Sequence, residues 1–205
     1  MARQSHEAEI ESWATVFGLS NKTVELAKQL LPIILCKKVY SMSKPLLALY
    51  TASIMSGEYI PLVFFIAITS VRNPTTERVI RVRPRFIRFD IKKYFGIELS
   101  TEKMVEAEVR GLCRVLKLDP VICETAVCTA VSALGEQQYI IRKSYTTYAL
   151  VIIRLVMRHM NIRLKPPPII PYARNLKMLM TTKRAEKYLG MCLDRARTTV
   201  ARQLQ

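Results

Sequence analysis

The residues of this sequence best suited to chemistry are basic side chains that recur at helical spacing near the carboxyl end. On a helix over 182–203, at about 100° per residue, cations gather on one side and small or apolar residues on the other. The cations are Arg184, Lys187, Arg195 and Arg202, with Lys183 and Arg197 flanking them. The apolar side is Ala185, Leu189, Cys192, Ala196 and Val200. Such a helix can dock its apolar side on a bundle while its basic side and positive N-terminus meet phosphate.

The residues before this helix complete the pattern of a helix-turn-helix. A helix is predicted at about 169–180, and Thr181 or Thr182 can cap the helix that follows. An ordinary solvated basic helix is the alternative. Such helices usually interleave Glu with Lys, whereas only Glu186 and Asp194 are acidic here. The pattern therefore favours contact with DNA.

A second basic segment, residues 72–93, carries a net charge of +6. If it is helical, one face presents Arg78, Arg81, Arg85 and Arg88, to which Arg83, Lys92 and Lys93 add. Pro84 interrupts the segment, so a broken or strand-like conformation is the alternative. Eight phosphate contacts across both basic segments predict a salt-dependence slope of about −7. Aromatic residues are sparse in both segments, which favours duplex DNA over a surface that stacks single-stranded bases.

Residues for catalysis, metal binding or cofactor binding are few. His6 and His159 are isolated, and the sequence has no Gly-rich phosphate loop, metal-ligand cluster or nucleophile elbow. The five cysteines form no C-x-x-C pair, so we expect free thiols in a reducing compartment. Solvated first-turn charges are expected at Glu7, Glu9, Glu11, Glu106 and Glu108. We therefore predict a protein that is not an enzyme and takes no cofactor, metal or small-molecule substrate.

The composition predicts an all-α protein with a polyanionic partner. Half of the 205 residues are apolar, and only 6 are glycine. The formal charge of +16 lies almost entirely in 72–93 and 142–205, whereas a merely soluble surface mixes both signs. Nucleic acid is thus favoured over an anionic membrane or an acidic protein.

The apolar stretch 45–71 is broken at 56–61, which favours buried helices over a membrane span. We expect a cytoplasmic, nucleoid-associated protein.

The two halves of the chain resemble each other at a fixed offset of 99 residues. When 7–44 is laid on 106–143, ten of the 38 aligned positions are identical, several times more than unrelated segments share. After seven extra residues in the second half, 75–78 match 181–184. The period is too long for a solenoid unit. It predicts two similar small domains, at 1–99 and 100–205.

Each half is expected to contain five helices, of which the third is the most apolar and therefore central. Ser20 or Asn21 caps the second helix, and Asp119 with Pro120 starts its counterpart. The helices of the first half are expected at 6–17, 20–34, 43–55, 60–71 and 75–95. Those of the second half are expected at 101–117, 119–134, 142–160, 169–180 and 182–203.

This pattern resembles the core of archaeal transcription factor B, which has two tandem five-helix cyclin-like repeats, each ending in a helix-turn-helix-like unit. The resemblance rests on the apolar third helix and the basic turn before it, at Ser43-Lys44-Pro45 and Arg142-Lys143-Ser144. The helix-turn-helix-like units are expected at 59–95 and 168–203. The resemblance implies binding of double-stranded promoter DNA beside a TATA-binding protein, with RNA polymerase as a further partner. It adds Lys143 to the candidate contacts and implies that the groove receives Thr181, Thr182, Lys183, Arg184 and Lys187.

The sequence also departs from that family. Full-length members begin with a zinc ribbon, and no paired cysteines are present here to form one. Recruitment of polymerase is therefore less firmly implied than DNA binding. Three alternatives stay open: a chromosomal or viral protein that coats DNA without sequence preference, a cyclin-like protein adaptor, and a membrane-associated helical protein.

Overall fold

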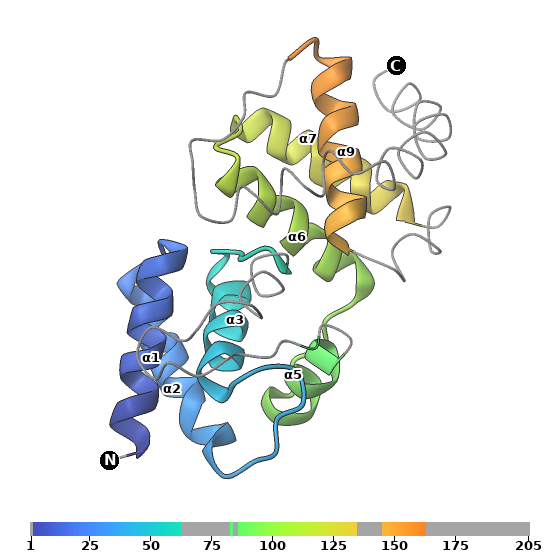
Figure 1. The fold of residues 1–205 in the computed structure, drawn as a ribbon. Helices are drawn as coiled ribbons and strands as arrows, with labels where there is room; N and C mark the ends of the chain where they lie inside the picture. Colours follow the sequence, from blue (N-terminus) through green and yellow to red (C-terminus); the bar gives the residue numbers. More distant parts are fainter. Residues whose placement is uncertain (1, 63–82, 84–85, 135–144, 163–205) are drawn as a thin grey trace. The chain divides into compact units, whose positions relative to one another are not determined.

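The computed structural model of the chain describes residues 2–62, 83, 86–134 and 145–162. These residues form seven helices and no strand, which confirms the predicted all-α class for this part of the chain. The chain divides into two compact units, Met1–Ser100 and Thr101–Gln205 (Figure 1). Within the described ranges, none of the helices combines the length and the apolar content that a membrane span needs.

The first unit is organised around its third helix. Its helices are α1 (Ala2–Phe17), α2 (Asn21–Leu35), α3 (Lys44–Ser56) and α5 (Ile87–Phe95). Every residue of α3 from Pro45 to Ser53 is buried, because α1, α2 and α5 all pack against this helix (Figure 1). Its apolar sequence on every side predicted this central place.

The ends of α3 follow from local sequence. Pro45 stands in the first turn, where its missing amide hydrogen is no loss. Gly57 ends the helix at φ 77°, a left-handed conformation that favours glycine. Glu58 then turns back to α2, where its Oε2 accepts hydrogen bonds from Ser20 N at 2.9 Å and Thr23 Oγ1 at 2.6 Å. A carboxylate is thereby placed at the positive N-terminus of α2.

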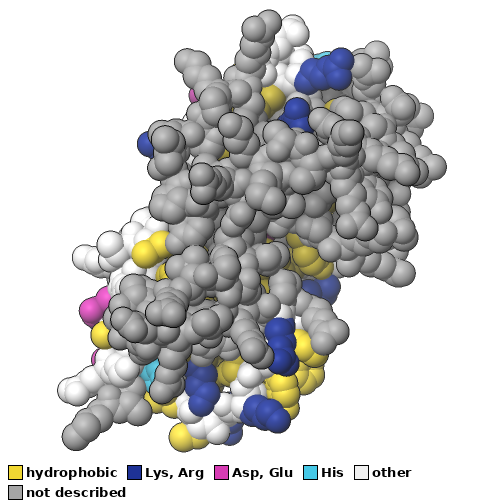
Figure 2. Space-filling model, viewed as in Figure 1, with side chains coloured by type: hydrophobic (Ala, Val, Ile, Leu, Met, Phe, Trp, Pro, Cys, Tyr) yellow, Lys and Arg dark blue, Asp and Glu magenta, His cyan; other side chains and the backbone are white. Residues whose placement is uncertain are grey.

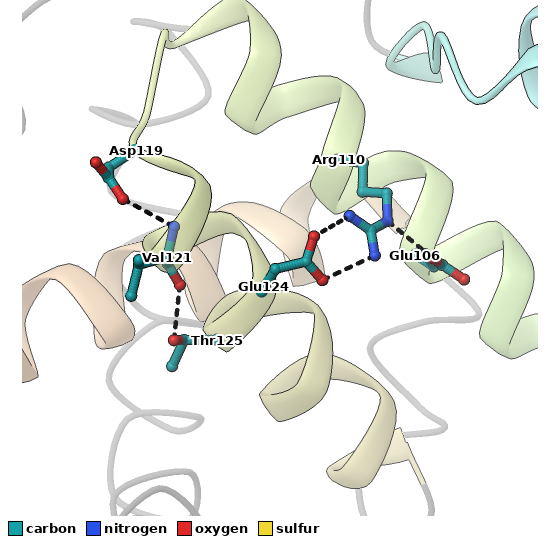
Figure 3. Close-up of polar contacts among 6 residues, drawn as sticks. All are labelled: Glu106, Arg110, Asp119, Val121, Glu124 and Thr125. Atoms are coloured by element: carbon teal, nitrogen blue, oxygen red, sulfur yellow. Dashed lines mark hydrogen bonds and ion pairs between the residues drawn. The ribbon is translucent and has the colours of Figure 1, made fainter.

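The second unit contains α6 (Thr101–Val115), α7 (Pro120–Ser132) and α9 (Tyr145–His159) among the described residues. Each of these helices packs against the other two. Arg110 on α6 joins two of them by a bidentate pair with Glu124 on α7, at 2.5 and 2.9 Å, and its Nε donates to Glu106 at 2.8 Å (Figure 3). Asp119 caps α7 by accepting from Val121 N at 2.8 Å.

The turn between the first two helices has the same backbone geometry in both units, 99 residues apart. Gly18 and Lys117 end the first helix at φ 62° and 51°. The next amide, of Leu19 or Leu118, donates to the carbonyl five residues back, at 3.0 and 2.9 Å. Both turns are therefore Schellman motifs. Lys117 adopts the left-handed conformation without being glycine, at a cost in backbone energy.

The helix caps and many buried residues of the two units also correspond at the offset of 99 residues. Ser20 and Asp119 both cap the second helix of their unit with a side-chain oxygen. Ser20 was one of the two caps predicted for the first unit, and the second unit was predicted to start this helix at Asp119 and Pro120. Many buried positions of the first two helices also coincide at the offset of 99. The buried pairs include Ile10 with Val109, Trp13 with Leu112, Ala14 with Cys113, Ala27 with Ala126, Leu31 with Ala130, and Ile34 with Ala133.

Two of the glutamates predicted to be solvated are instead buried. Glu9 is 5% exposed and Glu108 is 1% exposed, because Glu9 faces the start of α3 and Glu108 faces the start of α9. Ser43 Oγ donates to Glu9 Oε1 at 3.3 Å, and Thr146 Oγ1 donates to Glu108 Oε1. Helical periodicity correctly predicted the helices that carry these glutamates. The prediction that both glutamates are solvated was wrong, because it rested on their charge alone.

Several other expectations differ from the structure or lie outside the described residues. The first helix begins at Ala2, four residues earlier than predicted. The helix predicted over 75–95 is wrong at Arg83, which is not helical, and α5 begins only at Ile87, as the alternative of a broken conformation expected. The helices predicted at 60–71, 169–180 and 182–203 lie wholly or almost wholly outside the described residues.

Candidate nucleic-acid interface

The described residues bring lysines and aromatic rings together where α5 meets the loop between α2 and α3. Lys38 and Tyr40 come from that loop, and Phe89, Lys93 and Tyr94 come from α5. We call these five residues the lysine–aromatic surface. The Tyr40 and Phe89 rings meet edge to face, with centroids 6.4 Å apart.

Lysine ammonium groups lie over the rings of this surface. Lys93 Nζ is 5.2 Å from the centroid of Tyr94, 5.4 Å from that of Phe89 and 5.9 Å from that of Tyr40. A second lysine contacts Tyr40, since Lys38 Nζ lies 5.4 Å from the centroid of the Tyr40 ring. All four distances fall within the range of cation–π attraction. The rings thus hold two cations at defined places instead of leaving them free in solvent.

The two faces of α5 explain why the basic side points outward. Ile87, Asp90 and Ile91 are completely buried, and α5 packs on α2 and α3 through this side. Phe89 lies on the opposite side and is 52% exposed. The exposed cations of α5 share that opposite side: Arg88, Lys92 and Lys93. Helical periodicity therefore divides α5 into an inner face and a basic outer face.

Asp90 fixes the loop that carries Tyr40. Its Oδ2 accepts hydrogen bonds from Tyr40 N at 2.9 Å and from Ser41 N at 2.7 Å. The Tyr94 hydroxyl donates to the backbone carbonyl of Lys38 in the same loop. Two residues of α5 thus bind the backbone of a segment about 50 positions earlier. A buried carboxylate that satisfies two amides is a costly group to remove.

The electrostatics of this region are strongly positive. Lys37 and Lys38 are exposed in the loop whose backbone α5 binds, and Arg88, Lys92 and Lys93 are exposed on α5 itself. Glu98 pairs with Lys92 at 2.6 Å, and this hydrogen bond lowers the pKa of the Glu98 carboxyl. Figure 2 shows Lys and Arg side chains next to exposed hydrophobic ones over the part of the first unit where Figure 1 places α5. The surface therefore combines positive charge with exposed rings.

The structure describes only two of the predicted DNA-contacting residues. Arg83 and Arg88 are both exposed, and the amide of Arg83 donates to the carbonyl of Ser41 in the α2–α3 loop. Both arginines therefore flank the lysine–aromatic surface. Outside the described residues lie Arg78, Arg81, Arg85, Lys143, Thr181, Thr182, Lys183, Arg184, Lys187, Arg195, Arg197 and Arg202.

The sequence analysis did not predict several residues that lie next to the basic face of α5 in the folded chain. Lys37, Lys38 and Tyr40 lie in the weakly charged first part of the chain, and Tyr94 lies just past the end of the basic segment. Only one signal pointed to Tyr40, its identity with Tyr139 at the offset of 99. The segment-by-segment count of aromatic residues therefore understated how many rings accompany the cations.

No metal-binding cluster of three or more His, Cys, Asp or Glu occurs among the described residues. The cysteines among them are free thiols, of which Cys36 and Cys128 are exposed. Burial, and then the neighbouring Cys123, raise the pKa of the Cys113 thiol far above its usual range. A thiol in that state is a poor nucleophile.

Comparison of the chain with protein-family models, with curated proteins and with solved structures found no match.

Proposed function

We propose that this chain binds double-stranded DNA and acts without enzymatic chemistry. The observation that carries the proposal is the outer side of α5 with the adjoining loop, where five cations are exposed. These cations are Lys37, Lys38, Arg88, Lys92 and Lys93, and Lys92 among them pairs with Glu98. Together with the formal charge of +16, this surface fits the phosphates of a polyanion.

The proposal predicts how steeply the DNA-binding constant falls as the salt concentration rises. Five lysine or arginine contacts with phosphate release about five counterions, which gives a slope of log K against log salt of roughly −4.5. Contacts from the candidate residues in 163–205 would make the slope steeper. An adaptor that recognises a neutral protein surface has no reason for such a slope.

The finer form of the proposal is a promoter role. We propose that the two units act as cyclin-like repeats similar to the core of transcription factor B, beside a TATA-binding protein and with RNA polymerase as a further partner. The recurrence of Schellman turn, cap and burial at an offset of 99 supports two similarly built units. In this form the predicted helix at 182–203 enters the groove together with its preceding residue. The contacts are Thr181, Thr182, Lys183, Arg184 and Lys187.

The second candidate is a protein that coats DNA without sequence preference. The same observation supports it, because phosphate contacts carry no sequence information. The two candidates differ in partner and stoichiometry. A promoter factor needs a TATA-binding protein and one kind of site, whereas a coating protein binds any duplex at a stoichiometry set by its length.

The test is a gel-shift titration on TATA-containing and scrambled duplexes, with and without a TATA-binding protein, at two salt concentrations. A supershift that occurs only on the TATA-containing duplex, and only when the TATA-binding protein is present, supports the promoter role. Equal, steeply salt-dependent binding to both duplexes supports the coating protein. Absence of binding at low salt overturns both.

A matched pair of variants tests the surface itself. Lys37→Glu with Arg88→Glu reverses two cations of the basic surface, and Lys22→Glu with Lys103→Glu reverses two exposed lysines elsewhere. The first variant is expected to reduce the magnitude of the salt slope by about two, and the second to leave it nearly unchanged. Equal effects of both variants would show that net charge alone governs binding.

A further inference from the structure

We propose that the lysine–aromatic surface binds unpaired bases of single-stranded DNA, a role that goes beyond duplex binding and does not depend on it. The ring of Phe89 is 52% exposed on the outer side of α5. An exposed aromatic ring between cations is unusual for a surface that only contacts phosphates, because phosphate contact needs charge and no ring. Unpaired bases stack on such rings, and their backbone phosphates pair with adjacent cations.

The geometry holds the rings in place before any ligand arrives. Asp90 fixes the backbone of Tyr40 through two hydrogen bonds, and the Tyr94 hydroxyl binds the carbonyl of Lys38. Tyr40 in turn meets Phe89 edge to face. Rings whose positions are fixed by the fold lose little freedom when a base stacks on them, so more of the stacking energy appears as affinity.

Lys93 occupies the place that the ligand takes. Its ammonium lies within 5.9 Å of the centroids of Tyr40, Phe89 and Tyr94, so it shields these rings in the free protein. The side chain is exposed and has four rotatable carbons, so it can move to a nearby phosphate. Stacking of a base on an aromatic ring is stronger than an exposed cation–π contact, so the exchange favours the bound state.

The charge and the rings together select the ligand. In duplex DNA the base faces are already stacked on each other and cannot lie on a protein ring, so the rings select an unpaired strand. A basic peptide is repelled by Lys38, Lys93 and Arg88. A lysine-rich surface with fixed rings therefore fits a strand that offers both phosphates and open base faces.

The first test measures the binding of the full chain to a fluorescein-labelled oligothymidine of about 12 nucleotides by anisotropy, in parallel with a labelled duplex. Phe89→Ala is expected to weaken oligothymidine binding by roughly tenfold and leave duplex binding nearly unchanged. Val121→Ala removes another exposed apolar side chain, on α7, and serves as the matched control. It is expected to leave both affinities unchanged.

A second variant reports stacking directly. Trp13 is buried and is the only native tryptophan, so Phe89→Trp adds one exposed indole to the lysine–aromatic surface. Its fluorescence is expected to be quenched on saturation with oligothymidine, because a base stacks on the indole. Circular dichroism of each variant establishes that the helices are retained.

The outcomes separate this inference from the proposed function. Duplex binding by the native chain without oligothymidine binding overturns the inference and leaves the proposed function standing. Binding of neither overturns both. Equal losses for duplex and single strand in Phe89→Ala, an unquenched indole at saturation, or tighter binding of oligouridine than of oligothymidine each overturn the single-stranded DNA role.

Discussion

Glu9 and Glu108 lie 99 residues apart in sequence and make the same kind of buried contact in their two units. Each is on the first helix of its unit. Glu9 accepts a hydrogen bond from the Ser43 hydroxyl at the start of α3, and Glu108 accepts one from the Thr146 hydroxyl at the start of α9. Neither glutamate is more than 5% exposed. The contact ties the first helix of each unit to α3 or to α9 at a defined register. Its burial marks it as structural support within each unit.

The substitution Glu108→Ala tests this contact. It leaves the buried Thr146 hydroxyl without its partner and opens a cavity, so we expect a loss of roughly 2–4 kcal/mol in the free energy of unfolding. The measurement is urea unfolding followed by circular dichroism. Lys103→Ala, an exposed change on the same helix, is the control and should cost less than about 0.5 kcal/mol. Equal losses in the two variants would contradict a role for the buried glutamate.

The paired turns at Gly18 and Lys117 predict substitutions of opposite sign. Lys117→Gly relieves a left-handed conformation at φ 51° and should stabilise the chain by about 0.5–1 kcal/mol. Gly18→Ala imposes the same strain at φ 62° and should destabilise it by about 1 kcal/mol. A new Cβ at Gly18 meets no atom within 4 Å, so the cost comes from the backbone alone. Thermal unfolding of both variants checks the signs, and two shifts in the same direction would refute the paired assignment.

The ion pair of Arg110 and Glu124 predicts a pH dependence of stability. Its hydrogen bonds lower the pKa of the Glu124 carboxyl below the usual value of about 4.3. The pair therefore contributes its full stability above that value and loses it as pH falls through the lowered pKa. Arg110→Ala should be less stable than the native chain at pH 7, and the difference should shrink below about pH 4. Chemical unfolding at a series of pH values measures it, and a difference independent of pH would exclude the ion pair as the cause.

The cysteines are expected to differ in reactivity. Cys36 and Cys128 are exposed, whereas Cys113 is buried and its thiol pKa is raised by that burial and by Cys123. At pH 8 iodoacetamide should label the two exposed thiols first and Cys113 only when the chain unfolds. Mass spectrometry of tryptic peptides after timed labelling tests the order. Early labelling of Cys113 in the folded chain would mean that the packing of α6 against α7 opens readily.

The sequence by itself determined most of the described helices and several of their ends, because these depend on neighbouring residues. Ser20 was one of two caps predicted from residue type, and the helix start at Asp119 and Pro120 was predicted likewise. Gly57 ends the helix where the apolar run was expected to break. The central place of α3 followed from apolar residues on all its sides. The total charge and its concentration in two segments are likewise properties of the sequence alone.

Only the tertiary structure decided which polar residues are buried and which distant residues meet. Glu9 and Glu108 looked like solvated charges, yet each is buried against a hydroxyl 34 or 38 positions later. Tyr40 joins Phe89 because Asp90 binds its backbone across 50 positions. Helical periodicity and capping extend over only a few residues, whereas contacts across a unit depend on how whole helices pack. That packing has no signature within any short stretch of sequence.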